Sequence, residues 1–215
     1  MKADRALIRC SWATGVPAFY VRYHDEEWGV PCFDEAKMFE MLILEGAQAG
    51  LSWRTVLARR EAYRRAFDGF APERIARYDA RKIEALLAPG SGIIRNRLKV
   101  QAAVSNARAL LDLRERAARP ERALTDLFWS FVDGRPKQNA WRRPEDVPAT
   151  TPVSDALSRE LRRLGFKFVG STIVYAHMQA CGLVNDHLVT CICHAPVRAM
   201  GQALDESVSR HQVGA

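Results

Sequence analysis

Apolar residues along most of this 215-residue chain recur every three or four positions, and this spacing limits the possible folds most strongly. Such a spacing is typical of one face of a helix. The alternation of apolar and polar residues that indicates a half-buried strand is scarce, and most apolar segments end at Gly or Pro. We therefore predict an all-α fold, with residues 1–196 forming a single domain of two packed lobes. Residues 197–215 carry no such signal, and we expect them to form a disordered tail.

Individual helices are predicted from caps, apolar stripes and glycine stops. They are expected at 34–49, from near Ser52 to Gly69, at 75–87, from 95 onward, around Phe128 with a cap at Thr125 or Asp126, from a Ser154 cap to Gly165, and at 171–181. Residues up to Pro31 and residues 134–152 are expected to be irregular.

Charge and composition indicate the class of partner. The formal net charge of +7 favours a polyanion, although many basic proteins bind no nucleic acid. No apolar run approaches the roughly 20 residues of a membrane-spanning helix, and the N-terminus has no secretory pattern. We therefore expect a cytoplasmic protein without membrane contact. There the five cysteines would be reduced, and would serve in metal binding or in the core.

A carboxylate interrupts the apolar helix predicted at 34–49. Glu45 shares a helical face with Met38, Leu42 and Ala49. An ionised carboxylate among apolar neighbours is costly unless it has a partner, so its position suggests a partner such as a ligand. The alternative is a Glu at the edge of the stripe that reaches solvent. The segment alone leaves both interpretations open.

Potential zinc ligands lie near opposite ends of the chain: Cys10, His24, His187 and Cys191. His187 and Cys191 are four residues apart and would share one side of a helical turn, and thiolate with imidazole is a donor set that zinc favours. Cys193 and His194 are competing ligands, and the alternative is a set of unrelated buried side chains. Four protein ligands would leave no open position, so such a zinc would be structural. The pattern of a zinc deaminase is absent from the sequence.

A glycine turn is predicted between two helices in the middle of the chain. Its residues and the first turn of the following helix offer backbone N–H groups and cations to a DNA phosphate: Gly90, Gly92, Arg95, Arg97 and Lys99. The alternative is a simple turn without a ligand. Tyr23, Trp28 and Trp53 supply flat faces on which a base could stack, although core packing also explains each of them.

Several segments together resemble the DNA-3-methyladenine glycosylase I family of the helix-hairpin-helix superfamily, over roughly residues 9–194. The resemblance rests on Arg9-Cys10-Ser11-Trp12, Tyr23-His24-Asp25-Glu26-Glu27-Trp28-Gly29-Val30-Pro31, 44–53, Gly92-Ile93-Ile94-Arg95, Gly165-Phe166-Lys167-Phe168-Val169-Gly170 and 178–187. It implies a helix-hairpin-helix glycosylase fold in which a zinc clasp, made by the four ligands above, joins the N- and C-terminal segments.

The resemblance also implies an activity. The enzyme would bind double-stranded alkylated DNA, flip out 3-methyladenine, hydrolyse its N-glycosidic bond and release the free base. Tyr23, Glu45 and Trp53 would form the base pocket with Trp28 beside it, and Glu45 would be the catalytic residue. The catalytic Asp that other members of the superfamily place after the hairpin is absent here, since no Asp follows Gly92 before Asp112.

We expect a monomer with one structural Zn²⁺ per chain. Two rival functions remain at this point. One is a non-catalytic, zinc-clasped module that recognises DNA damage, and the other is a zinc hydrolase, which would require an open metal position.

Overall fold

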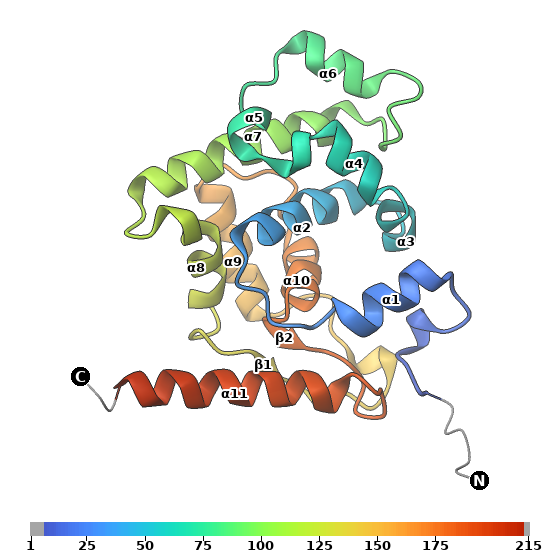
Figure 1. Cartoon of the computed structure of the whole chain (residues 1–215), viewed down its shortest axis with the longest axis vertical. Helices are drawn as coiled ribbons and strands as arrows, with labels where there is room; N and C mark the ends of the chain where they lie inside the picture. The colour runs from blue at the N-terminus through green and yellow to red at the C-terminus, as the bar shows by residue number, and fades with distance from the viewer. Residues whose placement is uncertain (1–6, 213–215) are drawn as a thin grey trace. The chain divides into compact units, whose positions relative to one another are not determined.

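The computed structural model of the protein describes the backbone of residues 7–212 and the side chains of residues 7–204. The chain divides into two compact units, each discontinuous in sequence. Unit 1 comprises Met1–Cys32, Val132–Ala149 and Met178–Ala215, and unit 2 comprises Phe33–Phe131 and Thr150–His177. Most of the described chain is helical, which confirms the predicted predominance of helix (Figure 1).

Unit 2 contains most of the helices. They are α2 (Glu35–Gln48), α3 (Trp53–Leu57), α4 (Arg60–Ala66), η2 (Asp68–Phe70), α5 (Pro72–Ile75), α6 (Ala80–Leu87), α7 (Arg97–Arg116), η3 (Pro120–Arg122), α8 (Ala123–Ser130) and α9 (Pro152–Arg163). Helix α10 (Ser171–Ala180) begins in unit 2 and ends in unit 1.

Helix α2 lies in the core of unit 2 and carries Glu45. Asp34 begins it as predicted, because its carboxylate accepts hydrogen bonds from the backbone N–H groups of Ala36 and Lys37. The helix is buried along most of its length and packs against α3, α7 and α8. Glu45 is therefore fixed on a rigid element.

Unit 1 combines helices with a short sheet. Its elements are η1 (Ser11–Ala13), α1 (Ala18–Glu26), β1 (Lys137–Gln138), η4 (Pro144–Asp146), β2 (Val184–Asn185) and α11 (His194–Gln212). The two strands are parallel, with Lys137 opposite Val184 and Gln138 opposite Asn185. Gly182 allows a close approach, because a Cβ atom there would lie 2.4 Å from the backbone of Val30 and Pro31.

The two ends of the chain differ from the prediction. The segment before Pro31, expected to be irregular, contains η1 and α1. Residues 194–212, expected to belong largely to a disordered tail, form helix α11, whose first turn tolerates Pro196. The prediction for residues 213–215 lies outside the described residues.

Two predicted helices are divided. The segment from Ser52 to Gly69 is interrupted at Arg59, whose φ of −105° and ψ of 5° leave the helical region, so that α3 and α4 are separate. The segment at 75–87 is divided as well: α5 ends at Ile75, and α6 begins only at Ala80, because the carboxylate of Asp79 caps α6 through the N–H of Lys82. Both breaks occur without a proline or glycine at the junction.

Two predicted caps are also wrong. Thr125 and Asp126 lie inside α8, and the carboxylate of Glu35 accepts the N–H groups of Leu124 and Thr125 instead. Thr151, rather than Ser154, caps α9, and Ser154 completes a reciprocal capping box.

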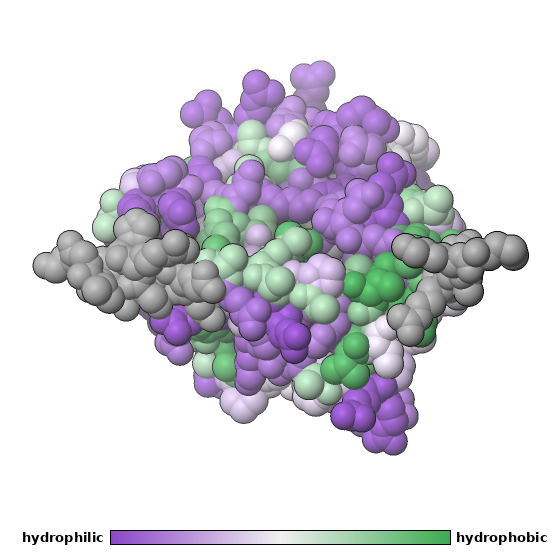
Figure 2. Space-filling view, turned by 60° about the horizontal axis from the view of Figure 1, so that its bottom comes forward, coloured by the Kyte–Doolittle hydropathy of each residue, from purple (hydrophilic) through white to green (hydrophobic). Residues whose placement is uncertain are grey.

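Among the described residues, no helix is both long enough and apolar enough to cross a membrane. On the face shown in Figure 2, hydrophilic residues occupy much of the surface and hydrophobic residues gather in small groups.

Candidate functional site

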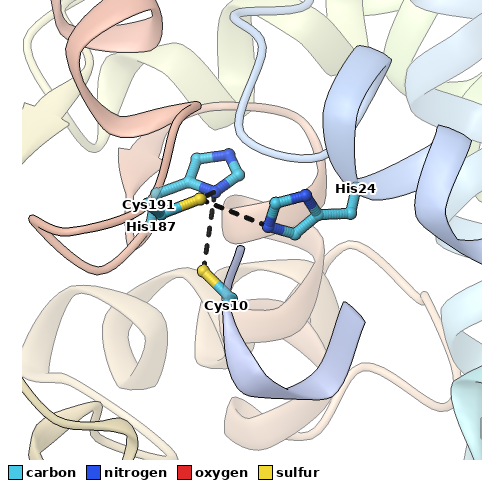
Figure 3. A group of neighbouring side chains, drawn as sticks. All are labelled: Cys10, His24, His187 and Cys191. Carbon is cyan, nitrogen blue, oxygen red and sulfur yellow. Dashed lines mark hydrogen bonds between the residues drawn. The ribbon is translucent and has the colours of Figure 1, made fainter. Parts of the chain in front are cut away.

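The four predicted zinc ligands converge in unit 1 (Figure 3). Cys10 Sγ lies 3.7 Å from His187 Nδ1, and Cys191 Sγ lies 3.5 Å from both His187 Nδ1 and His24 Nε2. All four side chains are buried, and their potential ligand atoms lie within 4.8 Å of one another. The juxtaposition predicted from the sequence is confirmed. Residues 187–191 form a turn rather than the expected helical turn, with the N–H of Cys191 donating to the carbonyl of Leu188.

Neighbouring groups orient both imidazoles. His24 Nδ1 lies 2.7 Å from a carboxylate oxygen of Asp25, and the guanidinium of Arg9 donates to the same carboxylate over 2.8–3.0 Å. His187 Nε2 lies 2.9 Å from the carbonyl oxygen of Trp28. Each ring therefore uses one nitrogen outside the cluster and points the other into it, an arrangement common around metal-bound histidines.

Glycine is required beside His187. Gly29 has a φ of +83°, and a Cβ atom there would lie 3.0 Å from His187 Nε2. Sequence reasoning missed Arg9, Asp25 and Gly29 as parts of this site. The available signal was their proximity in sequence to two predicted ligands.

The chemistry of the donor set fits a zinc ion. Hydrogen bonds with Cys10 and with Cys193 lower the pKa of the Cys191 thiol, and the backbone N–H of Cys193 also points at Cys191 Sγ over 3.4 Å. The cluster thus favours a thiolate at Cys191, the form that binds metals. Two sulfur and two nitrogen donors match the tetrahedral coordination of a closed structural site.

The two competing ligands lie outside this group of four. Cys193 Sγ is 3.9 Å from His24 Nδ1, the nitrogen that faces Asp25 rather than the cluster. His194 Nε2 is 3.0 Å from the carbonyl oxygen of Asn139. Neither side chain is needed to complete a set of four donors.

The segment before His187 is held by a buried carboxylate that sequence reasoning did not identify. Asp186 accepts hydrogen bonds from the side chains of Asn139, Trp141 and Gln179 over 2.7–2.8 Å. It also lines a cavity of about 340 Å³ that reaches Cys10.

Glu45 is buried in unit 2, with 3% of its surface exposed. Burial raises the pKa of its carboxyl to about 8, because the charged form loses its hydration. The carboxyl therefore holds its proton at neutral pH in the ligand-free protein. Trp53, predicted to act with it, follows the Ser52 cap as the first residue of α3 and is partly buried.

The predicted aromatic base contacts Tyr23 and Trp28 lie on or just after α1, in unit 1. The Trp28 ring packs edge-on against the His187 ring at 4.6 Å and against Trp12 at 5.1 Å between centroids. Tyr23 is buried, with its ring centroid 6.5 Å from that of Trp12. One side of Trp28 is thus part of the packing around the group of potential metal ligands.

The predicted glycine turn lies between α6 and α7. Gly90 and Gly92 have φ values of +89° and +77°, which favour glycine, and a Cβ atom on Gly92 would lie 2.8 Å from Ala62 Cβ. The N–H of Ile94 donates to the hydroxyl of Tyr63 over 3.3 Å. The turn is therefore locked against α4.

The three predicted phosphate-binding cations differ in their surroundings. Arg95 is exposed, whereas Arg97 forms a bidentate ion pair with Glu84 across the hairpin. Lys99 donates to the carbonyl oxygens of Ala47 and Ala49. The ammonium of Lys99 therefore points at the end of α2.

Comparison with known proteins identifies the family of the chain. The methyladenine glycosylase family matches residues 12–194. The chain is 48% identical to DNA-3-methyladenine glycosylase 1 of Escherichia coli, over 87% of this chain and 97% of the relative. A crystal structure of 3-methyladenine DNA glycosylase I, with 51% identity, matches with a TM-score of 0.82 over 87% of this chain and 100% of its own. The structure that describes 3-methyladenine recognition by the Staphylococcus aureus enzyme, with 34% identity, matches with a TM-score of 0.81 over 88% and 97%. The chain therefore belongs to the methyladenine glycosylase family.

Proposed function

We propose that the protein is a DNA repair glycosylase that hydrolyses the N-glycosidic bond of 3-methyladenine in alkylated double-stranded DNA. The observation that carries this proposal is the buried Glu45 carboxyl, fixed on α2 of a chain whose relatives are named for this activity. The family membership supports the reaction, and Glu45 supports the choice of substrate.

The chemistry of the lesion explains why a carboxylate is useful. Methylation at N3 makes adenine cationic, which weakens the glycosidic bond. When that bond breaks, its electron pair neutralises the base, and water adds to C1′ of the sugar and releases a proton. The leaving base therefore needs little acid catalysis, and the enzyme must chiefly select the cation over abundant neutral adenine.

Glu45 performs this selection in our proposal. In the ligand-free protein its carboxyl is protonated at neutral pH, because its pKa is about 8. A cationic base would displace that proton, since a nearby positive charge lowers the pKa of a carboxyl. The resulting carboxylate pairs with the cation and accepts a hydrogen bond from the base amino group. Neutral adenine offers no such gain.

Aromatic side chains supply the flat contacts in this proposal. We assign Trp53 to stacking on the base, Tyr23 to a contact with it, and Trp28 to its vicinity. The partial burial of Trp53 at the start of α3 and the packing of Trp28 against His187 support fixed rings, which lose little entropy on binding.

The glycine turn is proposed to hold the DNA backbone. Gly90 and Gly92 let the turn expose its backbone, and Arg95 presents an exposed cation next to it. Arg97 is assigned to the same DNA backbone, although its ion pair with Glu84 carries no net charge. We accordingly assign the α6–turn–α7 segment as the hairpin of a helix-hairpin-helix fold.

A structural Zn²⁺ is proposed for the group Cys10, His24, His187 and Cys191. When bound, the ion would supply tetrahedral cross-linking of the first and last segments of unit 1 and no open coordination position. This arrangement disfavours the zinc hydrolase.

One assay tests the function. The protein is incubated with methylated duplex DNA, and released 3-methyladenine is measured by chromatography, with unmethylated DNA as the control. Release of the free base by the parental protein, and its loss in Glu45→Gln, is the expected result. Tight binding to methylated DNA without release would favour the non-catalytic recognition module.

A further inference from the structure

Lys99 connects the hairpin helix to the segment that carries Glu45. Its ammonium donates hydrogen bonds to the carbonyl oxygens of Ala47 and Ala49 over 2.7 and 2.6 Å. These partners lie 52 and 50 residues away in the sequence. The side chain is partly buried, and burial lowers the pKa of its ammonium. Two of its three N–H donors are thus committed to α2.

The end of α2 needs such a donor. The last carbonyl groups of a helix have no partner inside the helix, and a cation there also interacts favourably with the helix dipole. The carbonyl of Gln48 is satisfied by the N–H of Leu51 at 2.6 Å. Lys99 satisfies the carbonyl groups of Ala47 and Ala49, the residues on either side of Gln48. One side chain therefore holds the chain where α2 ends.

The segment held in this way carries the proposed base contacts. Glu45 lies two residues before Ala47 in the last turn of α2, and Trp53 lies four residues after Ala49. Between them Gly50 has a φ of +75°, and a Cβ atom there would meet no neighbour within 4 Å, so no packing against a side chain at this position holds the turn. A support from outside the turn is therefore significant.

Lys99 is itself fixed from the hairpin side. Its backbone N–H donates to the side chain of Asn96, which caps α7. Asn96 in turn follows Ile94, whose N–H donates to Tyr63. The hairpin and the turn between α2 and α3 are consequently linked by a short series of hydrogen bonds within unit 2.

We propose that Lys99 is a positioning residue for base recognition, which holds the turn between α2 and α3 so that Glu45 and Trp53 keep the geometry that the base requires. This inference rests on the proposed function, because it takes Glu45 and Trp53 as base contacts. It replaces the sequence-based assignment of Lys99 to the DNA backbone. With two of its three donors given to the end of α2, the ammonium has only one donor left for a phosphate.

The test compares Lys99→Met with a matched control, Arg95→Met, which removes an exposed cation from the same hairpin. Three quantities are measured for each: affinity for free 3-methyladenine, the salt dependence of binding to unmodified duplex DNA, and thermal unfolding. We expect Lys99→Met to weaken base binding at least about fivefold, because misplaced contacts lose affinity, with an unchanged salt slope. Arg95→Met should bind the base normally and reduce the salt slope by about 0.9, the value for one phosphate contact.

Two results would overturn the inference. One is a Lys99→Met protein with a reduced salt slope and parental base binding, which would identify a phosphate contact. The other is a lower unfolding temperature with parental base binding in the folded protein, which would identify a purely stabilising role.

Two further arms keep the test decisive. If Lys99→Met does not fold, Lys99→Arg is used instead, because it keeps the cation but moves its donors. Weaker base binding by Lys99→Arg at the parental salt slope supports the inference, and parental base binding contradicts it. Failure of the parental protein itself to bind 3-methyladenine would instead count against the proposed function.

Discussion

Replacing Glu45 by Gln should change how the stability of the protein depends on pH. The buried carboxyl has a pKa of about 8 in the folded protein and 4.5 as its ordinary value. Between pH 4.5 and about pH 8, Glu45 holds a proton in the folded protein that it has released in the unfolded chain. The free energy of unfolding should therefore fall as pH rises through this window.

The size of the effect follows from the same two values. At 1.36 kcal/mol for each pKa unit, the difference between 4.5 and about 8 corresponds to on the order of 5 kcal/mol. Glutamine keeps the shape of the side chain but does not titrate. The free energy of unfolding of Glu45→Gln should therefore not fall with pH in this way. Compared with the parental protein, the variant should gain relative stability as pH increases.

Urea unfolding of both proteins at about pH 5, near the lower end of the window, and at about pH 9, above it, measures most of this gain. Other titrating groups are common to both proteins and cancel in the comparison. If the difference in unfolding free energy between the two proteins is the same at both pH values, Glu45 does not carry the buried proton and the argument fails.

The same proton governs catalysis in our proposal. Excision of 3-methyladenine should increase with pH up to about 8 in the parental protein, since deprotonated Glu45 pairs with the cation. In Glu45→Gln excision should be at least about tenfold slower, equivalent to about 1.4 kcal/mol, and should lack this rise. Excision at the parental rate by the variant would show that Glu45 is structural.

Three further predictions concern unit 1. Purified protein should contain about one equivalent of zinc, and a chelator or Cys191→Ser should lower the unfolding temperature substantially. Less than about half an equivalent of zinc by metal analysis would contradict the proposed site. Asp25→Asn should reduce zinc affinity about 10- to 100-fold in competition with a chelator, because His24 loses its orienting carboxylate; equal affinity would remove Asp25 from the site. Gly182→Ala should lower the unfolding free energy by at least about 2 kcal/mol in urea titrations, since its Cβ would lie 2.4 Å from the backbone of Val30 and Pro31; parental stability would refute the close approach.

Much of the helical pattern was predictable, because local signals determine it. Asp34 begins α2 as expected, and the apolar stripes of α7 and α9 mark real helices. Some failures involve local caps that were assigned to the wrong residue, such as Thr151 for α9, and others involve distant residues. Glu35 caps α8 from 89 and 90 residues away, which no local pattern could indicate.

The candidate site shows the same division. Residue type and spacing marked all four potential metal ligands as candidates, and the family resemblance then favoured them over a set of unrelated buried side chains. The role of Lys99 was not predictable, because an exposed lysine at a helix start and one that reaches the end of α2 look alike in sequence. Its partners are backbone atoms, which leave no trace in residue identity.

The discontinuity of unit 1 has a consequence for synthesis on the ribosome. The longer segment of unit 2, Phe33–Phe131, emerges as one continuous stretch and contains α2, the hairpin and α7. Cys10 must wait for His187, 177 residues later, and His24 must wait for Cys191, 167 residues later. Closing so long a loop is slow and costs entropy. The nascent chain would therefore contain α2 early and could assemble the group Cys10, His24, His187 and Cys191 only after Cys191 has been synthesised, so a ribosome that stops before His187 releases a chain that cannot complete this group.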